Sequence, residues 1–269
     1  MARFSLAVPA FILCVTAFAG DVVVIQPAKA EKTVETRSLP LAAGSSFKVE
    51  NVNGHVFVQA WDREEVAFTG AFQPSSRGEQ VKVVLQPTSK GLEIRCEYPK
   101  HSGGGFAYHG PRVDLDLKVP RSLLADLSTV NGDVSLEGTR GKASLITVNG
   151  GVKAQDLPEA LKAETVNGGI SLDRAAGPLV LTTVNGDIEA KALDGNGGGI
   201  KAETVNGSVH LVLGAAKGQV QAESMNGTVT FRAAGAQEVQ AKRHRVSATL
   251  PGSDQRIHIE TLNGGITVE

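Results

Sequence analysis

The chain has 269 residues, of which 41% are hydrophobic and 20% are charged, a balance typical of a protein that folds around a buried core. Its formal net charge of −1 excludes an overall electrostatic attraction to nucleic acid or to an anionic membrane surface. The 31 glycines, together with an aromatic content of only 4%, favour a narrow interior lined by small and branched side chains.

The N-terminus has the pattern of a secretory signal, so residues 1–30 are predicted to be a signal peptide. Arg3 precedes an uncharged apolar run over residues 4–19 that is short for a membrane span. Small residues at alternate positions allow cleavage after Ala19 or Ala30, and the polar sequence that follows favours Ala30. We therefore expect an exported protein (in the periplasm, on the cell surface or secreted) with no transmembrane span in the mature chain. An uncleaved N-terminal anchor is the alternative.

Cleavage would leave Cys96 as the one cysteine of the mature chain, so no internal disulfide is expected. Cys96 lies in a run of alternating apolar and polar residues at 92–96. This pattern predicts a buried thiol rather than a reactive one.

Residues 31–126 are predicted to form irregular β coils or a cap. Apolar alternation predicts strands over residues 47–61, 66–72, 81–85, 92–96 and 113–119. Only Val52, Asn53 and Gly54 match the motif that repeats later in the chain. A cap would cover the first strand edges, which repeat proteins must protect to stay soluble.

Residues 127–269 are predicted to form a regular repeat, because the motif Thr-Val-Asn-Gly recurs there. It occupies residues 129–132, 147–150, 165–168, 183–186 and 204–207, with close relatives at 51–54, 224–227 and 261–264. From Asn131 onward the motif asparagines are 18, 18, 18, 21, 20 and 37 residues apart. The last interval is close to two coils with one turn degraded. Apolar and polar residues alternate on both sides of the motif, which predicts strands with one buried face.

Two β architectures fit this repeat. Asn-Gly between alternating runs suits an antiparallel meander with type I′ turns. A solenoid explains better why the motifs are nearly identical, since equivalent corners then stack about 4.8 Å apart and asparagine side chains can bond from coil to coil. The threonines and the valines would likewise meet their own kind. Changes in repeat length fall in the opposite loop, as at residues 193–199, where they leave the stacked corners undisturbed.

We therefore predict an all-β fold: a single-stranded β-solenoid with coils of about 18–21 residues, continuous over residues 38–269. Its N-terminal coils are irregular or form a cap. The predicted turn and ladder residues are Asn53, Gly54, Asn131, Gly132, Asn149, Gly150, Asn167, Gly168, Asn185, Gly186, Asn206, Gly207, Asn226, Gly227, Asn263 and Gly264.

Three segments together resemble the DUF4097 putative-adhesin family over residues 47–269. They are residues 52–66, with Trp61 and Asp62, then residues 113–120, and then the Thr-Val-Asn-Gly series. The resemblance implies a right-handed, β-helix-like fold in a bacterial envelope or secreted protein. It supplies no catalytic residues.

The residues themselves predict no catalytic, cofactor or metal site. None of the six histidines has a ligand neighbour at a metal-binding spacing. Asp133 and Asp187 follow Asn-Gly turns, but the repeat is too long for a calcium-binding nonapeptide. The basic cluster of Lys242, Arg243 and Arg245 is either a solvated loop or a contact for an anionic envelope polymer.

These patterns predict a non-catalytic, adhesin-like binding or scaffold protein of the cell envelope, whose partner is an envelope polymer, glycan or protein and not nucleic acid. The alternatives are a β-helix carbohydrate-active enzyme and an accessory protein of an envelope-stress system. Outward-facing residues at equivalent positions are expected to engage an extended partner by avidity. One such row is Ser135, Lys153, Ser171, Glu189, His210 and Thr230.

Overall fold

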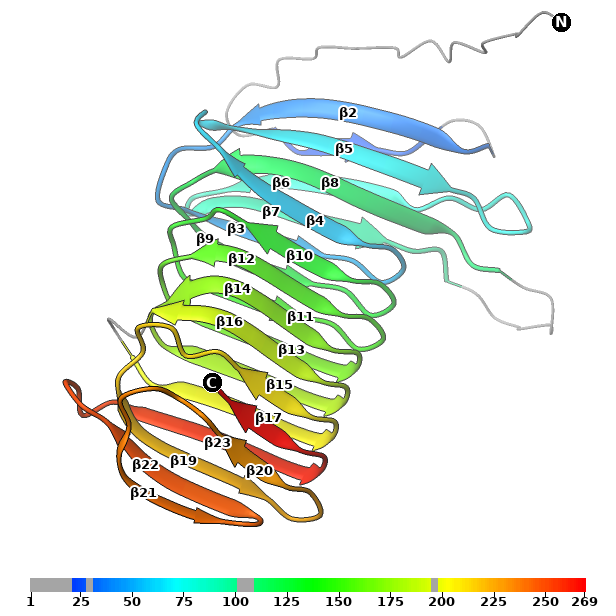
Figure 1. Cartoon of the computed structure of the whole chain (residues 1–269). Helices are drawn as coiled ribbons and strands as arrows, with labels where there is room; N and C mark the ends of the chain where they lie inside the picture. The colour runs from blue at the N-terminus through cyan, green and yellow to red at the C-terminus, as the bar shows by residue number, and fades with distance from the viewer. Residues whose placement is uncertain (1–20, 28–30, 101–108, 195–197) are drawn as a thin grey trace, which may run out of the picture.

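The computed structural model describes residues 21–27, 31–100, 109–194 and 198–269, and the regular structure in these ranges is entirely β-strand. Two long, mostly parallel sheets face each other across one elongated core (Figure 1). The predicted all-β solenoid is confirmed. No helix in these ranges is long and apolar enough to cross a membrane.

The first sheet has 13 strands. In spatial order they are β1 (Val23–Ile25), β6 (Lys82–Thr88), β7 (Gly91–Glu97), β3 (Ser45–Glu50), β9 (Leu123–Ser128), β11 (Ala143–Ile146), β13 (Leu161–Asn167), β15 (Leu179–Asn185), β17 (Ile200–Asn206), β23 (Arg256–Asn263), β19 (Gly218–Ser224), β22 (Arg245–Leu250) and β21 (Gln237–Lys242).

The second sheet has 11 strands. In spatial order they are β2 (Thr33–Pro40), β5 (Glu65–Gln73), β8 (Arg112–Pro120), β4 (Val56–Trp61), β10 (Val134–Glu137), β12 (Val152–Leu157), β14 (Ile170–Ala176), β16 (Ile188–Asp194), β18 (Val209–Leu211), β24 (Ile266–Val268) and β20 (Val229–Phe231).

Each regular coil contributes one strand to each sheet and passes between the sheets at the Asn-Gly motif, which we call the corner. Equivalent residues pair in register, so that Val152 lies between Val134 and Ile170. Alternate residues point inward, and Val152 and Ala154 are almost completely buried. The period of two in the sequence therefore reflects one core face per strand.

The N-terminal region combines regular coils with antiparallel strands. β3 and β4 form a coil whose parallel neighbours are β9 and β10 on one side and β7 and β8 on the other. β5 and β6 extend the sheets as antiparallel strands, and β2 and β1 pair with them at the end of the stack. The prediction of one strand over residues 47–61 is wrong, because a corner at residues 51–55 separates β3 from β4.

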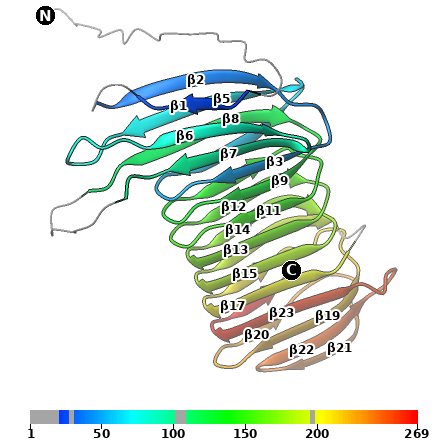
Figure 2. The same cartoon turned by 180° about the vertical axis from the view of Figure 1, so that it is seen from behind.

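The C-terminal segment enters the stack out of chain order. β23 lies between β17 and β19, and β24 lies between β18 and β20 (Figures 1 and 2). The prediction that the 37-residue interval spans two successive coils is wrong, because this interval contains the antiparallel hairpin β21–β22. β22 pairs with β19, and its buried residues Val246, Ala248 and Leu250 close the end of the core.

Cys96 is buried on β7, and burial raises the pKa of its thiol to about 12. The predicted buried thiol is confirmed. Most of the predicted signal peptide, including both cleavage positions, lies outside the described residues. Strand β1 falls within that prediction, and it pairs with β6 and buries Ile25. Cleavage after Ala19 would keep this strand, whereas cleavage after Ala30 would remove it.

Candidate functional site

The corner asparagines form a continuous hydrogen-bonded ladder. Asn167 Nδ2 donates to Asn149 Oδ1 at 2.8 Å, and Asn185 Nδ2 donates to Asn167 Oδ1 at 2.9 Å. In spatial order the ladder runs Asn53, Asn131, Asn149, Asn167, Asn185, Asn206, Asn263 and Asn226. Its order differs from the chain order only at Asn263, which β23 brings between Asn206 and Asn226.

Replacing Asn167 by alanine is expected to lower the free energy of unfolding by about 2 kcal/mol, because two ladder bonds are lost at about 1 kcal/mol each. Asn226 is the matched control, since it ends the ladder and makes one ladder bond. Its replacement by alanine should cost about half as much. Urea denaturation followed by circular dichroism measures both. Equal costs at the two positions would contradict a ladder that stabilises through its bonds.

The corner threonines are buried, and each hydroxyl donates to a glycine carbonyl of the neighbouring coil. Thr165 Oγ1 lies 2.8 Å from the carbonyl oxygen of Gly150, and Thr183 Oγ1 lies 2.9 Å from that of Gly168. The threonines also align in register, as predicted. Their hydroxyl bonds satisfy polar groups that would be costly to bury unpaired.

The residue between each corner threonine and asparagine points to solvent. Together these residues form an apolar line that we call the valine column. In spatial order it consists of Val52, Val130, Val148, Val166, Val184, Val205, Leu262 and Met225. The first seven are 36–39% exposed and Met225 is 68% exposed. The sequence predicted that the valines stack on one another, but not that they face solvent, although strand alternation from a buried threonine already places the next residue outside.

The predicted polar row on the outer face of the 11-stranded sheet is brought together, with Thr267 as an additional polar member and the exposed, apolar Phe57 next to Ser135. In spatial order it runs Phe57, Ser135, Lys153, Ser171, Glu189, His210, Thr267 and Thr230. Thr267 separates His210 from Thr230 because β24 lies between their strands.

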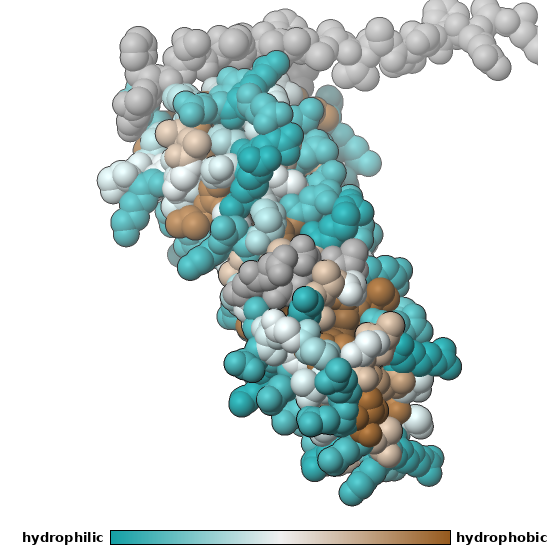
Figure 3. All heavy atoms as spheres, turned by 60° about the vertical axis from the view of Figure 1, so that its left-hand side comes forward, coloured by the Kyte–Doolittle hydropathy of each residue, from teal (hydrophilic) through white to brown (hydrophobic). Residues whose placement is uncertain are grey.

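Figure 3 shows one side of the whole molecule. This side is largely hydrophilic, with apolar atoms gathered over part of its C-terminal half.

The predicted basic cluster forms the exposed turn between β21 and β22, at the C-terminal end of the stack. Arg245 is paired with Glu223 at 2.5 Å. Lys242 and Arg243 make no ion pair with the described part of the chain. The turn packs on the last corner, where the Val229 amide donates to the Arg243 carbonyl at 3.0 Å.

Two polar hollows lie on the surface, one beside β4, β10 and β12 and the other near the C-terminal end of the stack. One, of about 430 Å³, is lined by Gln59, Ala60, Arg121, Glu137, Gly138, Arg140, Asp156 and Pro158. Another, of about 480 Å³, crosses the outer face of β19, β22 and β21, where glutamine and threonine side chains supply amides and hydroxyls. Arg174 donates to Asp156 at the first hollow at 2.6 and 3.1 Å, and this guanidinium lowers the pKa of the carboxyl.

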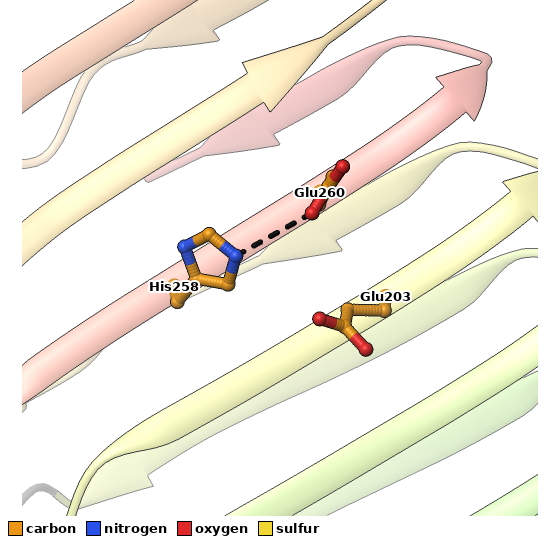
Figure 4. Close-up of side chains that lie close together, drawn as sticks. All are labelled: Glu203, His258 and Glu260. Carbon is orange, nitrogen blue, oxygen red and sulfur yellow. Dashed lines mark ion pairs between the residues drawn. The ribbon is translucent and has the colours of Figure 1, made fainter.

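Three potential metal ligands meet on the outer face of the 13-stranded sheet (Figure 4). Glu203 comes from β17, and His258 and Glu260 come from β23. One ligand atom of each lies within 4.8 Å of the others, and His258 Nε2 is 3.6 Å from Glu260 Oε2. This group is not predictable from the sequence, because Glu203 is distant in the chain and becomes a neighbour of His258 and Glu260 only through the insertion of β23.

Comparison with known proteins places this architecture in a family. The family model described as Toastrack DUF4097 matches residues 23–269. A putative adhesin from Bacteroides fragilis is 13% identical, with a TM-score of 0.48 and coverage of 89% of this chain and 99% of the other. A putative cell adhesion protein from Clostridium sporogenes is 14% identical, with a TM-score of 0.40 and coverage of 88% and 99%. No match was found among curated proteins.

Proposed function

From the premise that the chain belongs to the Toastrack DUF4097 family, we propose that it is an exported, non-catalytic protein of the cell envelope that binds or scaffolds an extended partner. The observation that carries this proposal is the valine column. A single exposed valine is ordinary on a protein surface. A line of apolar groups spaced about 4.8 Å apart offers the same contact in every coil, so weak contacts to an extended partner add together.

The neighbouring asparagine ladder supports this role. Because neighbouring carboxamides bond to one another, their positions are fixed, and little side-chain entropy is lost when a partner lies against them. The column and ladder therefore form a continuous surface with an apolar and a polar edge. Such a surface fits an elongated polymer or strand better than a compact ligand.

The charges in the first hollow suit an acidic group of a bound polymer. Asp156 is already paired with Arg174, whose guanidinium lowers the pKa of this carboxyl. Arg140, in the same hollow, forms no ion pair with the described residues, which leaves its guanidinium available to an acidic group of a bound polymer.

The test replaces Val148, Val166 and Val184 together by threonine. This change keeps the β-branched shape and exchanges one methyl group for a polar hydroxyl. Binding of the purified chain is measured on a glycan array, peptidoglycan sacculi and lipopolysaccharide vesicles. We expect the triple variant to bind its polymer at least tenfold more weakly, because three adjacent contacts are weakened. The control is Val180→Thr, because Val180 is equally exposed, at 36%, but lies outside the column.

Wild-type affinity in the triple variant would contradict a role for the valine column. A double variant, Lys242→Gln with Arg243→Gln, distinguishes the basic turn in the same assay. Loss of binding only in this double variant would move the contact to an anionic polymer at the C-terminal end. Failure of the wild-type chain to bind any of these polymers would count against the proposed function as a whole.

A further inference from the structure

We propose that Glu203, His258 and Glu260 form a site for a divalent transition-metal ion such as Zn²⁺. An imidazole nitrogen with two carboxylate oxygens is a ligand set that zinc accepts, with a fourth position left for water. Calcium and magnesium prefer oxygen ligands alone, so the histidine favours zinc over either. No property of the proposed envelope function is needed for this inference.

The geometry allows the three side chains to close on one ion. Their ligand atoms lie within 4.8 Å of one another. Zinc bonds of about 2.0–2.2 Å place tetrahedral ligands about 3.4 Å apart, so an approach of a little over 1 Å is required. The side chains are 31%, 34% and 59% exposed, which leaves room for the rotations that bring them closer.

The local charge also favours a cation. Carboxylates of three neighbouring strands stand directly opposite one another in register, namely Glu203, Glu260 and Glu223. Like charges in this arrangement destabilise a sheet. Lys201 lies 2.9 Å from the first carboxylate and Arg245 lies 2.5 Å from the last. The middle one, Glu260, has only His258 as an ion-pair partner among the described residues. A metal ion would supply positive charge where the protein supplies least.

The site would join two coils that are not consecutive in the chain. Glu203 belongs to β17, whereas His258 and Glu260 belong to the inserted strand β23. Unfolding separates these residues, so the ion binds the folded form in preference and stabilises it. The ion would therefore stabilise the position of the C-terminal coil between β17 and β19.

The experiment titrates the chelator-treated full chain with Zn²⁺ by calorimetry and follows thermal unfolding in parallel. We expect one ion per chain and a melting temperature that rises with Zn²⁺ concentration. His258→Gln and Glu203→Gln should each weaken binding at least tenfold, since each removes one of three ligands. Lys201→Gln removes the cation that competes for Glu203, so it should bind Zn²⁺ at least as tightly as the wild type.

His210→Gln is the matched control. His210 also has two neighbouring carboxylates, Glu269 at the same 3.6 Å and Glu189 opposite it in the sheet. Among the described residues these three do not come within the 4.8 Å that unites the proposed site, so this variant should keep wild-type affinity. Melting without metal verifies that every variant is folded. The proposal is overturned if the wild-type chain binds no Zn²⁺, if His258→Gln and Glu203→Gln keep wild-type affinity, or if Mg²⁺ binds as tightly as Zn²⁺.

Discussion

Gly150→Ala is expected to lower the free energy of unfolding by about 3 kcal/mol or more, or to prevent folding, because its methyl group would collide with a backbone. A Cβ atom at Gly150 would lie 2.0 Å from the carbonyl oxygen of Gly132 and 2.5 Å from its carbonyl carbon. A flexible side chain could move away from such a contact. The Gly132 backbone cannot, because its coil is fixed on both sides by the ladder and by strand pairing.

Gly151→Ala is the matched control, one residue further along the same corner. Its Cβ atom would come no closer than 3.4 Å to a neighbour, and Asp133, Asp187 and Ser208 occupy the equivalent position in other coils. We expect a change of less than about 1 kcal/mol. Urea unfolding gives the midpoint and slope of both variants. Equal stability of the two would show that the corners do not stack this closely.

The repeating glycine illustrates what the sequence could and could not predict. Its position at a corner was predictable from the spacing of the motif. An Asn-Gly corner predicts that glycine is needed for the backbone conformation of the turn, but only Gly54 and Gly132 among the motif glycines have a positive φ below 160°. The other corners need glycine because the backbone of a neighbouring coil lies against it, as the Gly132 backbone lies against Gly150. This contact depends on how closely the coils stack, which one repeat read alone does not reveal.

The order of the coils at the two ends was not predictable for a related reason. Alternation shows which face of a strand is buried, but every coil presents the same corner and therefore accepts the same neighbours. Asn263 fits the ladder between Asn206 and Asn226 as well as it would fit beyond Asn226. The group of Glu203, His258 and Glu260 was not predictable for the same reason, because Glu203 and His258 become neighbours only in the observed order of the coils.

The two ends of the stack share one topological feature, a coil inserted between two coils that are consecutive in the chain. The β3–β4 coil lies between β7–β8 and β9–β10, as the β23–β24 coil lies between β17–β18 and β19–β20. In both cases two coils that lie on either side of an inner coil are consecutive in the chain. The connection between these two coils therefore passes over the inner coil. Terminal segments usually fray because they are paired on one side. Here β23 is paired on both sides, so the C-terminal segment cannot leave without separating the coils around it.

This arrangement predicts that Ile259→Asp will lower the free energy of unfolding by about 4 kcal/mol or more. Ile259 is fully buried on β23, so the change removes an apolar side chain worth about 1.5–3 kcal/mol and places an unpaired carboxylate in the core. Thr267→Asp is the control, because Thr267 lies in the same coil but on the polar outer row, between His210 and Thr230. It should change stability by less than about 1 kcal/mol.

Hydrogen exchange locates the damage in the Ile259→Asp variant. In a stack of coils each unit contacts its neighbours only, so the loss should be greatest near the altered coil and decrease with distance from it. Amides of β17, β19 and β22 should exchange faster than in the wild type, while those of β9 and β11 should keep most of their protection. An even loss of protection along the whole stack would contradict this local role. It would mean that the solenoid unfolds as a single unit and that the inserted coil does not stabilise the C-terminal end in particular.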